Sequence, residues 1–148
     1  DLPFVDAMDE EVSRAFCVDR SRIFAVGWSS GGYFANQLAC ARDDRFRAIA
    51  SLSGGGPEAI QCSKAVPTLL YHDRGDSKVL YSTGRESLSA WRKTNGCSDS
   101  VRYWGDTDCL LFTECARAQP VVWCETEGEG HSVPPAIRDR VAAFVSSF

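Results

Sequence analysis

A serine, two aspartates and two histidines are the residues of this chain whose types and spacing could support nucleophilic catalysis. Ser29 stands in the stretch GWSSGG (27–32), between an apolar run and a segment of helical character. A Gly-x-Ser-x-Gly sequence in that setting is typical of a nucleophile elbow, a tight turn on which flanking glycines leave room for two close backbones. Ser29 is therefore a candidate nucleophile, with Gly27 and Gly31 expected to supply the space.

A serine hydroxyl needs a general base to remove its proton and a carboxylate that holds the base in the correct tautomer. His131 lies in a glycine-rich segment that can reach toward the serine, whereas His72 closes an apolar strand and fits a packed structural role. We predict that His131 is the base. Asp76, further from the strand, is the preferred carboxylate and Asp73 is the alternative; the plainer interpretation is that Asp76 caps a turn and His131 is a surface residue.

The pattern of apolar residues predicts the elements that must position these groups. Strands are expected over residues 22–28, 48–53, 66–72 and 121–126, and helices over 3–16, 33–41, 80–95 and 135–148. This alternation indicates an α/β fold, a mostly parallel sheet with helices on both faces. The candidate residues follow strands, so they should share the rim at the carboxyl ends. Residues 98–119 are expected to be irregular.

Length and composition narrow the class of protein. The 148 residues suit one domain, residues 1–148, and no apolar run reaches the roughly 18 residues of a membrane helix. A net charge of -4 argues against a nucleic-acid partner, because phosphate binding requires clustered lysine and arginine. Neither a membrane, a metal nor an organic cofactor is implied by the pattern of residues.

Seven cysteines in a chain of this size, with no Cys-x-x-Cys pair, favour disulfides in an oxidising compartment and hence a secreted protein. Buried free thiols in a cytosolic protein are the alternative. Cys17 and Cys40 are expected at the rim opposite the serine and form a plausible pair. Two further bridges are expected among the later cysteines, although the sequence leaves open which of them pair: Cys97, Cys109, Cys115 and Cys124. Cys62 is then left without an expected partner.

Four segments, taken together, resemble a known family. Residues 17–32, 67–81, 95–97 and 128–134 are similar to the secreted polyhydroxybutyrate-depolymerase and feruloyl-esterase branch of the α/β-hydrolases, and the resemblance covers essentially the whole chain. It implies that Ser29 is the nucleophile, Asp76 the orienting acid and His131 the base, in the chain order of that superfamily. The family often has a glycine where Asp73 stands in this chain.

The resemblance also implies that strands and an oxyanion loop precede the first helix in relatives, so the chain is expected to be truncated at its amino terminus. The N–H of Ser30 would be the first oxyanion donor, and the second donor would be missing. The edge of the first strand would then be exposed. We expect a missing amino-terminal segment or a second copy of the chain, as a homodimer, to cover it.

These observations predict a secreted serine carboxyl-ester hydrolase that acts through an acyl-enzyme on esters of a polymer. The substrate could be a polyhydroxyalkanoate, an aromatic polyester, or feruloyl or acetyl esters of polysaccharide. Trp28 and Tyr33 are the candidate substrate-binding aromatics, with Trp104 and Trp123 as weaker ones. A binding module or pseudo-enzyme that lost its oxyanion loop is the alternative, and a peptidase or thioesterase could use the same triad.

Overall fold

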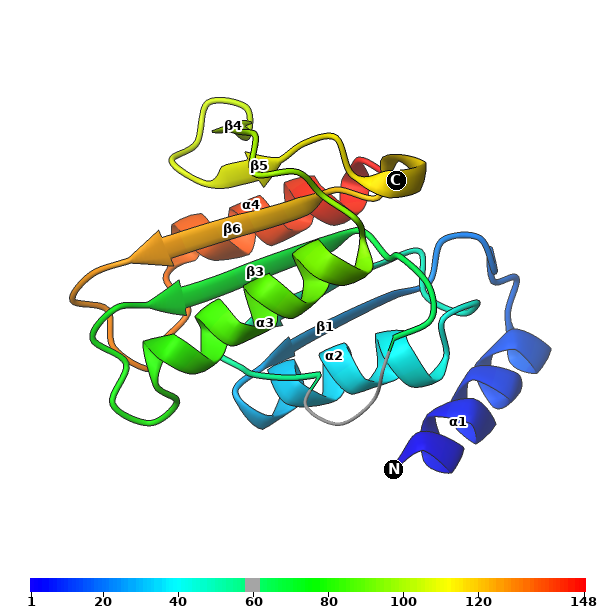
Figure 1. Cartoon of the computed structure of the whole chain (residues 1–148). Helices are drawn as coiled ribbons and strands as arrows, with labels where there is room; N and C mark the ends of the chain where they lie inside the picture. The colour runs from blue at the N-terminus through cyan, green and yellow to red at the C-terminus, as the bar shows by residue number, and fades with distance from the viewer. Residues whose placement is uncertain (58–61) are drawn as a thin grey trace.

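A six-stranded sheet forms the centre of the computed structural model, which describes residues 1–57 and 62–148 (Figure 1). Its strand order is β1-β2-β3-β6-β5-β4, with four parallel strands followed by two antiparallel ones. The mostly parallel α/β sheet predicted from the sequence is confirmed. The strands are β1 Phe24–Trp28, β2 Ala48–Leu52, β3 Thr68–Asp73, β4 Val101–Tyr103, β5 Leu110–Phe112 and β6 Val121–Thr126.

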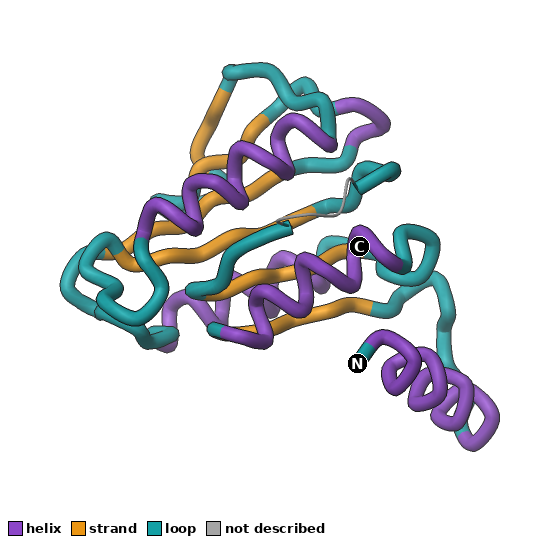
Figure 2. The backbone as a smooth tube through the Cα atoms, turned by 60° about the horizontal axis from the view of Figure 1, so that its bottom comes forward, coloured by secondary structure: helices purple, strands orange, loops and turns teal. Residues whose placement is uncertain are grey.

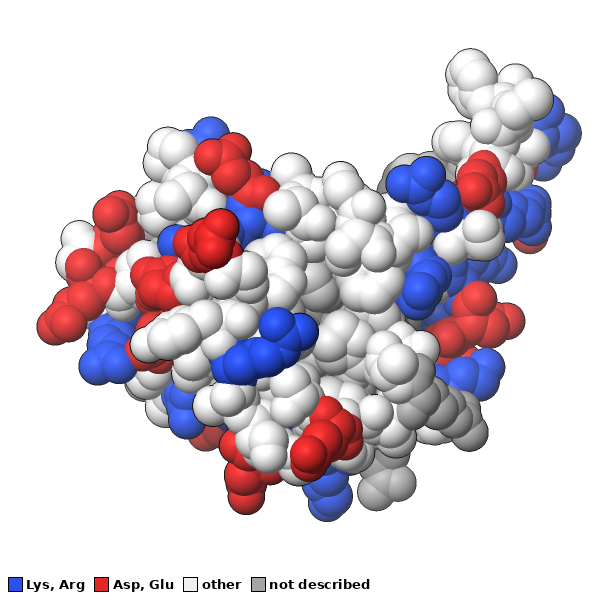
Figure 3. Space-filling view, turned by 90° about the horizontal axis from the view of Figure 1, so that it is seen from above, with Lys and Arg blue, Asp and Glu red and all other residues white. Residues whose placement is uncertain are grey.

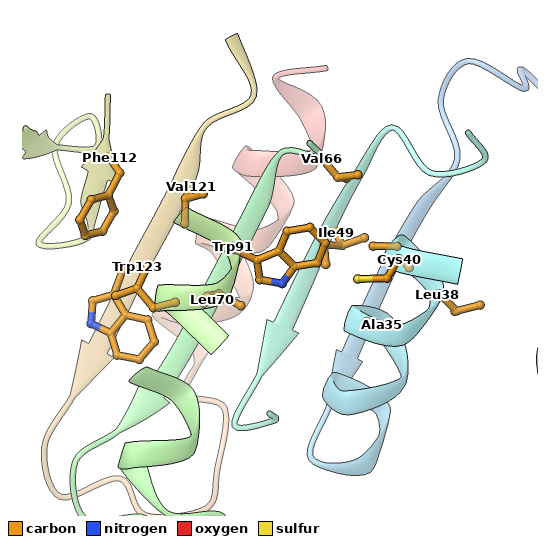
Figure 4. Packing of buried hydrophobic residues seen from close by; sticks show 13 residues of the cluster. Ala35, Leu38, Cys40, Ile49, Val66, Leu70, Trp91, Phe112, Val121 and Trp123 are labelled. Carbon is orange, nitrogen blue, oxygen red and sulfur yellow. The ribbon is translucent and has the colours of Figure 1, made fainter. Parts of the chain in front are cut away.

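Helices cover both faces of the sheet. Helices α2 (Ser30–Ala41) and α3 (Tyr81–Thr94) lie on one face, and α4 (Pro135–Ser146) lies on the other (Figure 1). Each face has its own buried cluster, because successive side chains of a strand point to opposite sides. Ile49 and Leu70 join the α2/α3 cluster, which Figure 4 shows around Trp91, whereas their chain neighbours face α4.

Burial explains why the central strands are the most apolar segments of the chain. Every residue of β2 and β3 is buried, as expected for parallel strands with helices on both sides. By contrast, β1 pairs on one side with β2 and alternates in burial, so that Val26 and Trp28 are exposed. Burial on both faces therefore holds β3 in place, and with it the two candidate acids, Asp73 at the end of β3 and Asp76 three residues later.

The segment expected to be irregular contains two short strands and a turn of 3-10 helix. β4 and β5 pair antiparallel, and β5 extends the sheet by pairing with β6; η1 (Ala116–Ala118) follows. The expectation of irregular structure over residues 98–119 was wrong in this respect. Strands of three residues are too short to show a period, and β4 is exposed throughout, so no alternation marks it.

The first disulfide differs from the expected one. Cys40 is bonded to Cys62, with 4.4 Å between their Cα atoms, and Cys17 is exposed and outside any disulfide. The expectations of a Cys17–Cys40 bridge and of an unpaired Cys62 were both wrong. The connection from β2 to β3 brings Cys62 beside the end of α2, a long-range approach that the spacing of cysteines in the sequence does not reveal.

The two bridges expected among the later cysteines are confirmed, and the structure supplies their connectivity. Cys97 is bonded to Cys115, and Cys109 to Cys124. The second bridge joins β6 to the residue just before β5, so it fixes the antiparallel part of the sheet to the parallel part. Three disulfides among the described residues fit an oxidising compartment.

Helix α1 (Leu2–Ala15) projects away from the sheet (Figures 1 and 2). Arg42 Nε donates a 2.8 Å hydrogen bond to Asp6, and Asp9 pairs with Arg45, so ion pairs hold α1 to the end of α2. Its exposed apolar residues form a row at four-residue spacing: Phe4, Met8, Val12 and Phe16. The predicted helix is confirmed, but none of its side chains is buried.

Charged side chains of both signs are interspersed over the face of the molecule in Figure 3. In the described part of the chain, no helix has the length and apolar character needed to cross a lipid bilayer.

Candidate active site

Ser29 occupies a sharp turn between β1 and α2. Its φ of 56° and ψ of -121° are values that a side-chain-bearing residue adopts at a cost of about 1–3 kcal/mol, when the surroundings hold it there. The surroundings here are backbone hydrogen bonds: the N–H of Ser29 donates to the Leu52 carbonyl at 2.9 Å, and its own carbonyl accepts from the N–H groups of Gly32 and Tyr33. The turn thus presents the Ser29 hydroxyl at the rim.

Two glycines make this turn possible, and one of them was not expected. A Cβ on Gly27 would lie 1.9 Å from the Gly31 carbonyl oxygen, so only glycine fits there. A Cβ on Gly31 would meet nothing within 4 Å, so its expected role in supplying space was wrong. Gly32 takes that role instead, because its Cβ would approach Ser51 Oγ at 2.9 Å, where α2 lies close to β2.

Three side chains from distant parts of the chain form a continuous hydrogen-bonded line. His131 Nε2 lies 2.8 Å from Ser29 Oγ, and His131 Nδ1 lies 2.7 Å from Asp76 Oδ2. Ser29 follows β1, Asp76 follows β3 and His131 follows β6, so the shared rim of the parallel strands brings them together. A neutral His131 with its proton on Nδ1 donates to Asp76 and leaves Nε2 free to accept the serine proton.

The Asp76 carboxylate is fully buried and satisfied on both oxygens. Oδ1 accepts the N–H groups of Lys78 at 2.8 Å and Val79 at 3.0 Å, while Oδ2 accepts from His131. Burial raises the pKa of Asp76, but the hydrogen bonds from His131, Val79 and Lys78 lower it more, so its pKa lies below the ordinary value. Asp76 is therefore charged at neutral pH and holds the His131 ring by its Nδ1.

Asp73, the alternative acid, has its carboxylate occupied by donors other than the His131 ring. Its two oxygens accept four hydrogen bonds: from Thr126 Oγ1 at 2.7 Å and from three backbone N–H groups, those of Gly75, Glu129 and Gly130. Burial raises the pKa of Asp73, yet these donors bring it below the ordinary value. The geometry therefore separates two aspartates that the sequence left as alternatives.

His72, the second histidine, is buried behind the site. Its Nε2 lies 2.8 Å from the Val79 carbonyl oxygen and 3.5 Å from Asp76 Oδ2, and its ring packs on Gly84, where a Cβ would meet Nδ1 at 2.4 Å. His72 thus supports the loop that carries Asp76 and does not contact Ser29. Its place at the end of a fully buried strand was the sequence signal for this structural role.

Glu125 sits beneath the rim on β6 and was missed in the sequence. Tyr81 and Arg74 donate to its carboxylate, as does Trp123 Nε1 at 2.8 Å. Burial raises the pKa of Glu125, but the hydrogen bond from Tyr81 and those from Arg74 and Trp123 lower it to about 2. The carboxylate therefore ties the start of α3 to β6. A glutamate directly after four consecutive apolar residues in β6 was the signal that could have revealed it.

The expected oxyanion donor and aromatic residues lie near the serine. Ser30 begins α2, where N–H groups lack intrahelical acceptors and the helix dipole favours negative charge. The Trp28 side chain is 49% exposed, and its ring centroid lies 5.1 Å from that of His131. Tyr33 is half-buried, and its ring is close enough to Gly55 that a Cβ there would lie 2.5 Å from it.

The two weaker aromatic candidates are packed elsewhere. Trp123 is 1% exposed inside the α2/α3 cluster, and Trp104 packs edge-on against Phe144 of α4. The expectation of Trp123 as an exposed aromatic near the rim was wrong, because β6 is a central strand covered by α3. On a central strand with helices on both faces of the sheet, a tryptophan packs against a helix whichever face its side chain is on.

Comparison with known proteins gives the same class as the geometry. A prolyl oligopeptidase family model matches residues 3–55. Among curated relatives, a probable feruloyl esterase C of Aspergillus niger is 30% identical over 153 residues, covering 96% of this chain and 54% of the relative. Feruloyl esterase D of Neurospora crassa is 27% identical, covering 94% and 49%. The chain thus spans about half the length of the curated relatives it matches.

Solved structures are similar over nearly the whole chain. An acetyl xylan esterase from Aspergillus awamori aligns with a TM-score of 0.75 at 15% identity, covering 97% of this chain and 66% of its own. Esterase PE8 aligns with a TM-score of 0.71 at 20% identity, covering 99% and 59%. At these identities the likeness defines the fold.

The parallel sheet, the strand-to-helix turn at Ser29 and the similarity to these proteins place the chain among the α/β-hydrolases. Within that superfamily the curated relatives it is similar to are feruloyl esterases, about half of whose length it spans.

Proposed function

We propose that the protein is a secreted serine carboxyl-ester hydrolase in which Ser29, His131 and Asp76 carry the chemistry. The observation that carries the proposal is the unbroken line of two hydrogen bonds, 2.8 and 2.7 Å long, from Ser29 Oγ through His131 to Asp76. The similarity to feruloyl esterases supports an ester as the substrate. The three disulfides support secretion.

The first half of the reaction forms an acyl-enzyme. His131 Nε2 takes the proton of Ser29 as Oγ attacks the ester carbonyl carbon, and the carbonyl oxygen gains the negative charge. The Ser30 N–H, at the start of α2, faces that charge as one oxyanion donor. When the tetrahedral intermediate collapses, the bond to the alcohol oxygen breaks and His131 gives its proton to that oxygen.

The second half returns the serine. His131 Nε2 takes a proton from water as the water oxygen attacks the acyl carbonyl, and the proton then passes to Ser29 Oγ as the acid leaves. Asp76 accepts the Nδ1 proton of His131 in a hydrogen bond throughout, at 2.7 Å in the resting protein, and its charge stabilises the imidazolium formed in each half.

The substrate proposed is an ester of a polymer, with an aromatic acyl group the best fit. The half-exposed Trp28 ring beside His131 offers a flat surface next to the serine, and Tyr33 lies on the first turn of α2. Feruloyl esters of polysaccharide are favoured by the relatives, with acetylated polysaccharide, polyhydroxyalkanoates and aromatic polyesters as the other classes to be tried.

The test is labelling of Ser29 by a fluorophosphonate probe together with hydrolysis of methyl ferulate and p-nitrophenyl acetate. We expect Ser29→Ala to abolish labelling and to lower kcat by at least about 10⁴-fold, and Asp76→Asn to lower kcat by about 10⁴-fold. Ser30→Ala is the matched control, because it removes a neighbouring hydroxyl and keeps the backbone N–H; labelling should persist.

A folded wild-type protein that neither takes up the probe nor exceeds Ser29→Ala in hydrolysis contradicts the proposal. That result would favour a binding module, in which the same three side chains are retained without turnover. Hydrolysis of a thioester or peptide in preference to every ester tried would retain the nucleophile and change the substrate class.

A further inference from the structure

Asp73 receives an unusual number of donors for a residue outside the proton relay. It ends β3, is 0% exposed, and accepts four hydrogen bonds, two on each oxygen. Oδ1 accepts from Gly75 N at 2.8 Å and Gly130 N at 3.0 Å; Oδ2 accepts from Thr126 Oγ1 at 2.7 Å and Glu129 N at 3.0 Å. A buried carboxylate is costly unless it is fully satisfied, and this one is.

Two of these donors belong to the residues immediately before His131. The loop from β6 to α4 contains Gly128 at φ 92° and Gly130 at φ 61°, values that glycine adopts readily and other residues rarely do. Such a loop has many conformations in its unrestrained state, because glycine limits the backbone least. The N–H groups of Glu129 and Gly130 are held on one carboxylate, which is itself fixed to a fully buried central strand.

The restraint of this loop by Asp73 bears on the chemistry because the His131 ring must be placed accurately. His131 must keep Nε2 near 2.8 Å from Ser29 Oγ and Nδ1 near 2.7 Å from Asp76 Oδ2 at the same time. A misplacement of about 1 Å at a reacting group can cost roughly 100-fold in rate. The backbone one residue before His131 is therefore where a restraint acts most directly on its ring.

We propose that Asp73 is a positioning residue whose carboxylate clamps the backbone at Glu129 and Gly130 and thereby places His131 between Ser29 and Asp76. The expected effect on kcat rests on the proposed hydrolase function. The restraint of the loop by Asp73 does not depend on that function. Asp73 thus holds the backbone before His131, and Asp76 holds the His131 ring.

Asp73→Asn tests the clamp because it preserves the size of the side chain. Asparagine keeps one acceptor oxygen and places an NH₂ group where the other oxygen accepted a backbone N–H, so at least one of Glu129 and Gly130 loses its acceptor. We expect kcat on p-nitrophenyl acetate to fall about 10- to 100-fold with KM within about 2-fold, since the loop sets the base and not the substrate surface.

NMR of protein labelled with ¹⁵N-histidine supplies a readout that does not depend on turnover. With two histidines in the chain, the Nδ1–H proton of His131, hydrogen-bonded to Asp76, should appear far downfield in the wild type and be lost or broadened in Asp73→Asn. The Nε2–H proton of His72, which donates to the Val79 carbonyl, is the internal control and should persist.

Asp6→Asn is the matched control variant, because Asp6 accepts its hydrogen bonds from Arg42 at the far side of the molecule. It should leave kcat and the His131 signal unchanged. If Asp73→Asn retains both the wild-type kcat and the His131 signal, the inference is overturned.

If Asp73→Asn does not fold, hydrogen exchange in the wild type decides the question. The amides of Glu129 and Gly130 should exchange at least about 10-fold more slowly than in an unstructured peptide, and exchange at the unstructured rate would overturn the inference. If the wild type neither hydrolyses esters nor labels at Ser29, the proposed function fails, while the NMR and exchange measurements still test the clamp.

Discussion

Two regions of the molecule differ in which side chains they bury and which they expose. One is the rim at the carboxyl ends of β3 and β6, and the other is the flank formed by β1 and α1. At the rim, Asp73 and Asp76 are buried and accept hydrogen bonds on both oxygens. On the flank, apolar side chains face outward, with Val26 52% exposed and Phe4 and Phe16 each 70% exposed. The two aspartates of the rim have their carboxylate oxygens satisfied, whereas the flank leaves apolar surface uncovered.

This difference separates two parts of the proposed catalytic site. The hydrogen bonds that align His131 come from β3, β6 and their loops, which sit in the middle of the sheet. Ser29, by contrast, follows the strand on the flank, where β1 pairs with β2 on one side. Substitutions that disturb closely packed backbone, at the rim or at the serine turn after β1, should lower the free energy of unfolding most, and substitutions of exposed side chains on the flank should lower it least.

The largest effect is expected from Gly27→Ala at the serine turn. Its Cβ would lie 1.9 Å from the Gly31 carbonyl oxygen, so the turn must distort, with a loss of several kcal/mol in the free energy of unfolding. Gly31→Ala is the matched control, because its Cβ meets nothing within 4 Å, and it should change stability by less than about 1 kcal/mol. Urea unfolding measures both; equal losses would contradict the assignment of the close contact to Gly27.

An intermediate effect is expected from acid. The pKa values of Asp73, Asp76 and Glu125 are lowered in the folded protein, that of Glu125 to about 2, so their contribution to stability is present above the unfolded values near 4 and is lost as pH falls toward 2. For Glu125, whose side chain is 28% exposed, the contribution is about 2 kcal/mol.

Glu125→Gln isolates that contribution. Urea midpoints at pH 6 and pH 2.5 should show the variant less stable than the wild type at pH 6, with most of that difference gone at pH 2.5, because the carboxylate of the unfolded chain is then protonated and that of the folded protein is beginning to be. A stability difference that does not depend on pH would mean that packing, and not charge, is what Glu125 contributes.

The smallest effect is expected on α1. Phe4→Ser and Met8→Ser should each change the free energy of unfolding by no more than about 0.5 kcal/mol, because their side chains are 70% and 49% exposed. Thermal unfolding of this chain at low concentration measures the change. A loss above about 1 kcal/mol would show that the apolar row is covered in solution and that the flank is less open than its exposed side chains indicate.

The chemistry-bearing residues could be found in the sequence because each follows a strong local pattern. Ser29 stands between a strand pattern and a helix pattern, and the loops of Asp76 and His131 each begin where a buried apolar run stops. Parallel strands end on one edge, so three separate local patterns converge on a single place in the fold. No knowledge of tertiary contacts was required to put them there.

The partner of Cys40, the role of Asp73 and the glycine that matters beside Ser29 were decided by the tertiary structure alone. Each depends on an approach between segments far apart in the chain: Cys62 reaching the end of α2, Gly130 reaching Asp73, and Gly32 lying against Ser51. The sequence by itself determined the four parallel strands, their order along the chain and the candidate proton relay, because hydrophobic period and turn chemistry are local. The pairing of a donor with an acceptor depends on the distance between segments far apart in the chain, and the packing of the folded protein sets that distance.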